Sequence, residues 1–387
     1  MNILLVSDVY LPTVSGVASS TDSIAKYLAS QGHTVFLACP KPTNPISQNI
    51  DRLHIIYTPS LPDPFFVGKR MAFIPFGISH LWKIMTENHI DIAHIQEPVG
   101  LGLMALFCCK IRHIPTVGAL HTSIEQIRLI AKPIIRPFVP TFMRIYLRAI
   151  YPNYDGVMVP TNTVVAFLRT ILGPKQIIQA VSNGVDTNEF VPLPNNMTLR
   201  KTLKTPNDKI LFLHVGRLDS DKNIETIFRA LTLTGPKVHF LLAGIGKQEQ
   251  ALQTLAQQLG INEKITWIGR IDKPEMIHWY QAADAFIIMS PVETQSIVAL
   301  QAIAAGLPLI AARAGALPEL VHDRASGYLL DTYDHKSLAK HMDMLAKDSI
   351  LRKRMGKEGR TLSLPHHKPV ALAELIRLFE RVLAKRS

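Results

Sequence analysis

The sequence predicts an α/β protein of two doubly wound parallel sheets, and three observations support this fold class. Short apolar, strand-like runs alternate with helical patterns along nearly the whole chain, as they do where parallel strands are covered by helices on both faces. The length of 387 residues exceeds what one hydrophobic core usually organises. The alternation is interrupted by one stretch rich in Gly, Asn and Pro, after which it starts again.

In the first half, the alternation begins almost at the first residue. The apolar runs 3–6 and 34–38 flank a glycine-containing loop and a helical pattern over 20–31, which together predict a βαβ unit. The further elements expected in this half are, in chain order, a strand at 92–95, a helix at 99–110, strands at 116–120 and 157–160, and a helix at 161–172.

The interruption lies between Asn183 and Pro206. After it we expect strands at 209–215, 238–243, 265–268, 285–289 and 308–311, with helices between them. The expected domains are 1–190, 191–364 and a C-terminal helix at 365–387 that packs back toward the N-terminal domain. Ligands of doubly wound sheets bind outside the carboxyl ends of the strands, so we expect the two Rossmann-like domains to face each other across a cleft.

Composition excludes several classes of protein. The content of hydrophobic residues, 47%, is too high for a disordered chain. Cys39, Cys108 and Cys109 fit neither a disulfide framework nor a zinc site. The N-terminus lacks the basic region of a signal peptide. The longest apolar stretch considered as a membrane span, 98–109, is too short to cross a bilayer. We therefore expect a cytoplasmic protein, free or peripheral at the inner face of the membrane.

The net charge of +12 indicates attraction to anions, and the charge is unevenly distributed. The segment 127–151 has no acidic residue, and its cations are Arg128, Lys132, Arg136, Arg144 and Arg148. Between them stand the bulky residues Ile134, Ile135, Phe138, Phe142 and Tyr146. This mixture is typical of an interfacial membrane element, although Pro133, Pro137 and Pro140 exclude one long helix. The alternative is a solvated basic face over the core. No RNA-recognition motif or aromatic stacking platform is evident, so no nucleic-acid partner is expected.

The stretch VGRLDSDKN, residues 215–223, has the pattern of an anion site. Arg217 and Lys222 lie on a loop between a buried strand and a helix N-terminus, where two cations and the helix dipole suit a diphosphate. The alternative is a solvated basic loop whose cations neighbour Asp219 and Asp221.

A second candidate stretch covers residues 290–321. Glu293 lies on the loop that follows a strand, where it could hold sugar hydroxyls. The next helix begins near Ser296 and Ile297, and its free N–H groups could bind a phosphate. Gln301 lies one turn beyond Ile297 and so faces the same side. For Glu293 the alternative is a helix-capping acid, since acids are favoured at helix starts.

Together these segments resemble the superfamily of retaining glycosyltransferases with the GT-B fold. One such match would be weak, but the matches occur in the family's order along nearly the whole chain. They are SGV at 15–17, SNGVDTNEFVP at 182–192, VGRLDSDKN, AGIGKQEQ at 243–250, WIGRID at 267–272, GLPLIA, GALPELV and ASGYLL at 325–330.

The resemblance implies a role for each matching residue. Gly16 would let the N-terminal loop approach the donor diphosphate, and Arg217 and Lys222 would neutralise the departing nucleoside diphosphate in place of a metal. Gly269 and Arg270 would approach the base, and Glu293 would bind hydroxyls of the transferred sugar.

His121 stands where the family has a histidine near the reacting sugar, although a purely structural histidine is an alternative. Two positions depart from the family. Gln301 replaces the second glutamate of the Glu-x7-Glu motif, which holds the ribose, and Ser296 replaces a common glycine, so its side chain is expected to crowd the phosphates.

The resemblance is nearest to diacylglycerol glucosyltransferases and phosphatidylinositol mannosyltransferases. It implies transfer of a hexose from a nucleotide sugar such as UDP-glucose to a membrane lipid such as diacylglycerol, with no cofactor or metal. Two alternatives stay open at this point: transfer to a soluble or polysaccharide acceptor, and a non-catalytic protein that binds sugar nucleotides.

Overall fold

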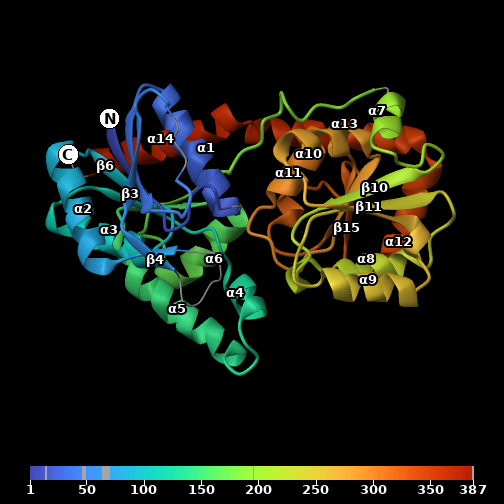
Figure 1. Ribbon diagram of the computed structural model, residues 1–387, viewed down its shortest axis with the longest axis horizontal. Helices are drawn as coiled ribbons and strands as arrows, with labels where there is room; N and C mark the ends of the chain where they lie inside the picture. Colours follow the sequence, from blue (N-terminus) through green and yellow to red (C-terminus); the bar gives the residue numbers. More distant parts are fainter. Residues whose placement is uncertain (14, 46–48, 63–69, 195, 386–387) are drawn as a thin grey trace. The chain divides into compact units, whose positions relative to one another are not determined.

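The computed structural model describes residues 1–13, 15–45, 49–62, 70–194 and 196–385. The chain forms two compact units, drawn in Figure 1. Unit 1 comprises 1–122, 138–183 and 371–387, and unit 2 comprises 123–137 and 184–370. The chain thus first passes into unit 2 with the short segment 123–137, and the main division falls after Asn183 rather than after 190.

Unit 1 is built on a seven-stranded sheet whose strands pair in parallel. Its strands are, from edge to edge, β3 (Leu53–Thr58), β2 (Thr34–Pro40), β1 (Asn2–Val6), β6 (Ile92–Ile95), β7 (Thr116–Ala119), β8 (Gly156–Val159) and β9 (Ile178–Ala180). The expected strands coincide with β1, β2, β6, β7 and β8. The two edge strands, β3 and β9, were not expected from the sequence.

Helices cover both faces of this sheet. Ile3 and Leu5 of β1 belong to a core cluster with α1 and α14, whereas Leu4 and Val6 point to the opposite face, against which α3 packs. The helices are α1 (Gly16–Ser30), α2 (Ile74–Glu87), α3 (Gly100–Ile111), α5 (Val139–Ile150), α6 (Asn162–Leu172) and α14 (Lys368–Ala384), and β4 (Ser60–Pro62) pairs with β5 (Arg70–Ala72) beside them. The cysteines are all buried and form no disulfide.

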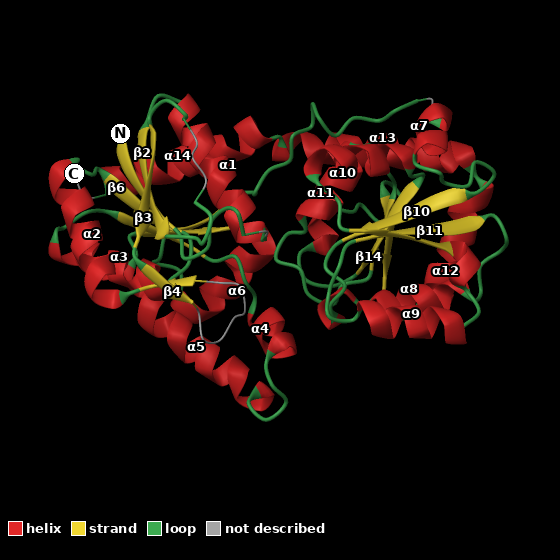
Figure 2. Ribbon diagram, in the orientation of Figure 1, coloured by secondary structure: helices red, strands yellow, loops and turns green. Residues whose placement is uncertain are grey.

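Unit 2 repeats this plan with a six-stranded parallel sheet. Its strands are, from edge to edge, β12 (Ile265–Gly269), β11 (Val238–Ala243), β10 (Ile210–Val215), β13 (Ala285–Ile288), β14 (Leu309–Ala312) and β15 (Gly327–Leu330). Figure 2 shows α10, α11 and α13 on one side of the sheet and α8, α9 and α12 on the other. The doubly wound fold class expected from the sequence is therefore confirmed for each unit.

The helices of unit 2 are α4 (Ile124–Ile130), α7 (Met197–Thr202), α8 (Ile224–Leu231), α9 (Glu249–Gln258), α10 (Lys273–Ala282), α11 (Ile297–Ala304), α12 (His335–Lys347) and α13 (Ser349–Ser363). In the described part of the chain, no helix is both long and apolar enough to cross a membrane.

Strand order places the functional loops. In each sheet the chain winds outward, returns to the centre and winds the other way, so the order reverses between β1 and β6 in unit 1 and between β10 and β13 in unit 2. Loops that leave the carboxyl ends of two such strands diverge and leave room for a ligand. In unit 2 these loops carry Arg217 and Lys222 after β10 and Glu293 after β13.

Candidate active site

Two loops of unit 2 pack backbone against backbone to form the base of the site. The N–H of Leu218, in the loop after β10, donates to the carbonyl of Ile245 (3.0 Å), in the loop after β11. A Cβ added to Gly244 would lie 1.7 Å from the carbonyl oxygen of Gly216, and one added to Gly246 would lie 2.5 Å from the backbone of Leu218. Both glycines are therefore needed for the close approach that holds the VGRL loop in place.

Arg217 projects from this loop, and its side chain is 60% exposed. The guanidinium donates to Asp219 and to Oδ2 of Asp221 (3.2 Å). Asp221 is buried, so it acts as a fixed anchor for the arginine. The exposed position leaves Arg217 able to turn toward an anionic ligand.

Lys222 forms a nearly enclosed charge cluster with Glu293. Its Nζ lies 2.8 Å from Oε1 of Glu293 and 3.4 Å from Oδ2 of Asp221, and the Lys222 and Glu293 side chains are only 14% and 10% exposed. Burial acts to lower the pKa of Lys222, but the carboxylates of Glu293 and Asp221 outweigh it and raise the pKa. Lys222 is therefore a fixed cation, and the alternative of a solvated basic loop does not describe it.

The backbone around Glu293 is positioned by a glycine turn and a buried serine. The N–H of Ala316 donates to the carbonyl of Glu293 (2.9 Å), and a Cβ on Gly315 would lie 2.4 Å from that same oxygen. Ser290 Oγ donates to the carbonyl of Asp221 (2.7 Å) and so joins the loop after β13 to the Lys222 loop. The GALPELV segment thus has a structural function under the site.

Helix α11 begins at Ile297, and Ser296, not Glu293, supplies its cap. Ser296 has a left-handed backbone with φ of 68°, which explains why glycine suits this position. Its hydroxyl accepts from the N–H of Ala299 (3.4 Å). The hydroxyl thus turns back onto its own helix, and the expectation that it crowds a phosphate stays a prediction.

Gln301 lies on α11 beside the buried side chain of Tyr280. The Tyr280 hydroxyl is 3.0 Å from the carbonyl of Val298 and 3.2 Å from Oε1 of Gln301. One hydroxyl proton cannot serve both oxygens. If the amide is turned so that Nε2 donates to the tyrosine, Oε1 becomes free to accept from a ligand.

Gly269 ends β12, and Arg270 follows it. Gly269 has φ of 75°, its carbonyl accepts from the N–H of Gly244 (2.8 Å), and a Cβ there would meet no atom within 4 Å. Arg270 is exposed, and its side chain contacts no partner among the described residues. The space beside Gly269 is open, and the approach of these residues to the base stays a prediction.

Of the two residues expected in unit 1, His121 follows β7 and Gly16 begins α1. His121 Nε2 lies 2.8 Å from Oε1 of Gln96, and burial lowers the pKa of His121 to about 4, although part of the residue keeps contact with solvent. The imidazole is therefore neutral at pH 7. Gly16 is the exposed first residue of α1, after the cap Ser15, and a Cβ there would meet open space.

Sequence reasoning missed several polar groups of this region. Asp8, after β1, accepts from the N–H groups of Leu101 (2.7 Å) and Gly102 (3.1 Å) at the start of α3, and burial raises the pKa of Asp8 to about 8. No local motif marks Asp8, because its partners lie far away in the sequence. Asp221 was considered only as a neighbour of the cations, and Tyr280 has no signal in the sequence.

The basic segment of residues 127–151 divides at its prolines, as expected. Helix α4 ends at Ile130, the 3-10 turn η1 covers Arg136–Phe138, and α5 begins at Val139 with Pro140 in its first turn. Among its bulky side chains, Ile134 is 81%, Phe138 71% and Phe142 64% exposed. Ile135 and Ile145 are also exposed.

Three members of this segment differ from the expectation. Tyr146 points inward, because its hydroxyl donates to the carbonyl of Pro98, and Ile145 takes its place on the exposed face. Arg136 is half-buried and donates to the carbonyls of Leu129 and Ala131, and Arg128 pairs with Glu125 (3.0 Å). Lys132, Arg144 and Arg148 remain as exposed cations.

Across the described residues, no group of three or more His, Cys, Asp and Glu side chains is arranged to hold a metal ion. The charges that surround the candidate site in unit 2 are those of Arg217 and Lys222 and of the carboxylates that they contact.

The family models and the relatives that match this chain are all glycosyltransferases. Residues 14–189 match the model of Glycosyltransferase Family 4, and residues 195–362 match that of Glycosyl transferases group 1. The chain is 30% identical to the alpha-monoglucosyldiacylglycerol synthase of Streptococcus pneumoniae, over 85% of this chain and 75% of that protein. It is 24% identical to the GDP-mannose-dependent alpha-mannosyltransferase of Mycolicibacterium smegmatis, over 100% of this chain and 99% of that protein.

Solved structures agree on the fold. The sucrose-phosphate synthase of Thermosynechococcus elongatus superposes with a TM-score of 0.81 at 21% identity, over 99% of both chains. Anabaena Alr3699/HepE superposes with a TM-score of 0.78 at 17% identity, over 100% of both chains. The protein is thus an enzyme of the GT-B glycosyltransferases, with a Family 4 region in its N-terminal half and a group 1 region in its C-terminal half.

Proposed function

We propose that this glycosyltransferase moves a glucosyl group from UDP-glucose to diacylglycerol in a membrane, with retention of the anomeric configuration and without a metal. The observation that carries the proposal is the enclosed contact between Lys222 and Glu293 (2.8 Å), with the exposed Arg217 beside it. Two cations suited to a diphosphate thus lie next to a carboxylate suited to sugar hydroxyls, which supports the proposal. The names of two relatives, the alpha-monoglucosyldiacylglycerol synthases of Streptococcus pneumoniae and Acholeplasma laidlawii, support the sugar and the lipid.

The reaction needs no separate base. The acceptor hydroxyl oxygen forms a bond to the anomeric carbon while the bond to the diphosphate oxygen breaks on the same face. The hydroxyl proton passes to that departing oxygen. Arg217 and Lys222 offset the charge that develops on the diphosphate, so catalysis is mostly positioning and electrostatic stabilisation. The roles that the resemblance gives to Gly16, His121, Gly269 and Arg270 stay predictions.

Support for a lipid acceptor comes from the surface of α5. Phe138, Phe142 and Ile145 recur at helical spacing, are 71%, 64% and 61% exposed, and define what we call the α5 apolar stripe. Arg144 and Arg148 are exposed on the same helix. An exposed apolar stripe with neighbouring cations suits the headgroup region of an anionic bilayer.

The test is a product assay with radiolabelled UDP-glucose and vesicles that contain diacylglycerol. Glucosyl-diacylglycerol is the expected product, with the α configuration, and its rate should not change in EDTA. Product formed only from GDP-mannose would show that GDP-mannose, not UDP-glucose, is the donor. Product formed only on a soluble glycan would show that the acceptor is not a lipid. Binding of UDP-glucose without turnover on any acceptor would favour a non-catalytic protein. Loss of turnover in EDTA, restored by Mg²⁺ or Mn²⁺, would contradict metal independence.

Membrane attachment is tested by co-sedimentation with vesicles of phosphatidylglycerol and phosphatidylcholine. Changing Phe138, Phe142 and Ile145 together to Ser should abolish most of the binding. The matched control changes Val99, Phe107 and Ile111 to Ser, because these residues are also exposed apolar side chains of unit 1. Equal sedimentation of both folded variants and the parent would remove the α5 apolar stripe from the proposal.

A further inference from the structure

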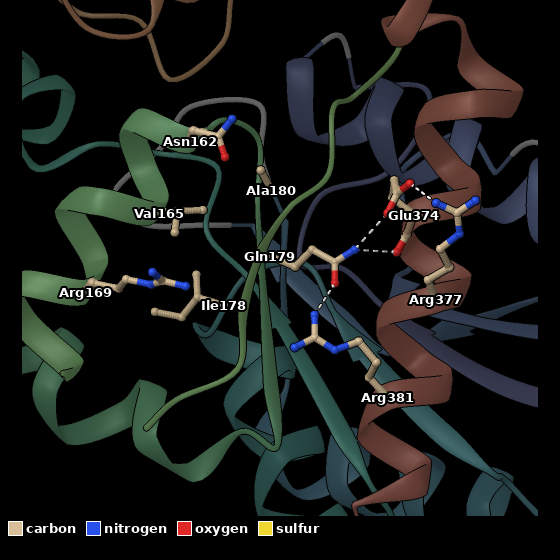
Figure 3. A pocket seen from close by; sticks show the side chains of 9 residues that line it. All are labelled: Asn162, Val165, Arg169, Ile178, Gln179, Ala180, Glu374, Arg377 and Arg381. Atoms are coloured by element: carbon tan, nitrogen blue, oxygen red, sulfur yellow. Dashed lines mark hydrogen bonds and ion pairs between the residues drawn. The ribbon is translucent and has the colours of Figure 1, made fainter. Parts of the chain in front are cut away.

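A groove runs along the edge strand β9 of unit 1, between α6 and α14 (Figure 3). Its volume is about 520 Å³, enough for a small phosphorylated molecule. All of its walls belong to unit 1, so it is separate from the charge cluster of Lys222 and Glu293 in unit 2. No motif of the glycosyltransferase family falls on it.

Three arginines line this groove, and one acid opposes them. Arg377 pairs with Glu374, which leaves Arg169 from α6 and Arg381 from α14. Arg381 Nη1 donates to Oε1 of Gln179 (2.9 Å), and its other N–H groups remain available. The guanidinium of Arg169 has no hydrogen-bond or ion-pair partner within the described ranges of the chain. The groove therefore has an uncompensated positive charge on each side.

Gln179 fixes the floor of the groove relative to α14. Its Nε2 donates to the carbonyl of Glu374 (3.1 Å) and to Oε2 of the same residue (3.2 Å), while its Oε1 accepts from Arg381. The side chain thus links the strand to both a cation and an anion of the helix. This link holds Arg381 over the strand, where its free N–H groups can meet a ligand.

The backbone of β9 supplies further donors. The N–H of Val157 donates to the carbonyl of Ile177, and the N–H of Val181 donates to that of Val159, so alternate residues of β9 face β8. Ile178 and Ala180 are the residues whose N–H and C=O groups face the open edge, because β9 has no second neighbour in the sheet. The floor of the groove therefore offers both hydrogen-bond donors and acceptors between the two arginines.

We propose that this groove is a binding site for the phosphate group of a phosphorylated polyol. Arg169, Arg381 and the edge N–H groups bind the phosphate oxygens, since guanidinium groups match phosphate in geometry and charge. The edge carbonyls accept from hydroxyls of the same molecule. The edge strand has three residues, which favours a small ligand over an added peptide strand. The phosphate can come from a soluble ester or from a lipid headgroup.

The experiment is calorimetric titration with glycerol 3-phosphate and with inorganic phosphate, in the presence of excess UDP to fill any donor site. The variant Arg169→Gln/Arg381→Gln should bind glycerol 3-phosphate at least about tenfold more weakly than the parent. The matched control, Lys110→Gln/Lys175→Gln, loses the same charge elsewhere on unit 1 and should bind as the parent does. The single variant Arg169→Gln disrupts no described contact, so it replaces the double variant if that does not fold.

Vesicle co-sedimentation separates the two sources of phosphate. If the ligand is a lipid headgroup, the Arg169→Gln/Arg381→Gln variant binds phosphatidylglycerol vesicles less than the control does. If the ligand is soluble, vesicle binding is equal and only the titration differs. Equal behaviour of this variant and its control in both measurements would overturn the proposal. So would binding of an acidic peptide, such as oligoglutamate, with no binding of either phosphate. Neither result depends on whether the enzyme uses UDP-glucose.

Discussion

The two units share a fold but differ in the polar side chains that follow their central strands. Each sheet has a buried histidine whose Nδ1 bonds to a carbonyl of the next strand: His94 to Val117 (3.1 Å) in unit 1 and His214 to Ile287 (2.9 Å) in unit 2. After β10 and β13, unit 2 presents paired charges. After β6 and β7, unit 1 presents the uncharged pair of Gln96 and His121, beside the acid Glu97.

Under the proposed function, this difference gives the two units different roles. Diphosphate transfer needs fixed positive charge, and unit 2 holds Lys222 and Arg217 against carboxylates before any ligand arrives. Such preorganisation avoids reorganisation during the reaction. An alcohol acceptor carries no charge, and a neutral imidazole in unit 1 would bind it without attracting a competing anion.

The largest expected effect follows from removing Lys222. In Lys222→Gln, Glu293 and Asp221 would face each other with no cation between them in an almost enclosed position, where breaking one side of a buried ion pair costs about 3–5 kcal/mol. Affinity for UDP and turnover should each fall by roughly 100-fold or more, because the lost contacts to the diphosphate are charge-assisted. Calorimetry with UDP and the product assay measure the two effects.

Arg217→Ala is the matched comparison. Arg217 is 60% exposed, and Lys222 still lies 3.4 Å from the buried Asp221 when Arg217 is removed, so no enclosed charge loses its last partner. UDP affinity should fall by about tenfold or more. Unchanged UDP affinity in a folded Arg217→Ala/Lys222→Ala variant would remove this site from the proposal. A larger loss in Arg217→Ala than in Lys222→Gln would reverse the order that burial predicts.

Acid should destabilise unit 2 through its buried histidine, whereas in unit 1 the raised pKa of Asp8 opposes the effect of His94 and His121. Burial lowers the pKa of His94, His121 and His214 to about 4, from an ordinary value of 6.5. The unfolded chain therefore takes up protons near pH 6.5 that the folded chain does not, and the stability present above that pH is lost as pH falls toward 4. Each imidazole should contribute on the order of 1–3 kcal/mol. Urea unfolding between pH 7.5 and 5 measures this slope.

Variants assign that acid effect to the units. His94→Gln should remove its share of the acid destabilisation from unit 1, and His214→Gln should flatten the pH dependence of unit 2. His278→Gln, which removes an exposed histidine, should leave the slope as it is. If the slope is the same in all three variants, other groups cause the acid sensitivity.

The sequence predicted the features that depend on neighbouring residues and missed those that depend on distant ones. The loop after β10 was predicted because its glycines and cations lie within a few residues of one another, and the strands at the sheet centres were predicted because they are continuous apolar runs. The edge strands β3 and β9 were missed, since the first mixes polar and apolar residues and the second has three residues. Contacts such as Asp8 with Leu101 join distant segments, and no local pattern marks them.

The variant Ser296→Gly tests whether the backbone and hydroxyl of Ser296 affect stability and UDP binding. Ser296→Gly should relieve the left-handed backbone at φ of 68° but remove the cap of α11. The relief of strain is of order 1 kcal/mol, and the loss of a serine cap to glycine costs a few tenths. The melting temperature should thus stay equal or rise slightly, with UDP affinity changed less than threefold. A large loss of UDP affinity would show that the hydroxyl binds the ligand rather than the helix.

The smallest expected effect concerns Gln301, where the family has a glutamate. In Gln301→Glu the carboxylate can accept from both hydroxyls of a ribose, so UDP affinity should be equal or slightly higher. The gain is limited because Tyr280 would then face an acceptor only, and its proton would have to leave the carbonyl of Val298 to reach the new carboxylate. Tyr280→Phe separates these effects. In the parent, it should free the amide of Gln301 to rotate and so weaken UDP binding a few-fold. In Gln301→Glu, it should leave the carboxylate without its donor and so weaken UDP binding more. Calorimetry on the four proteins of this double-mutant cycle gives the coupling energy. Abolished UDP binding in Gln301→Glu alone would show that the glutamine serves a group other than the ribose.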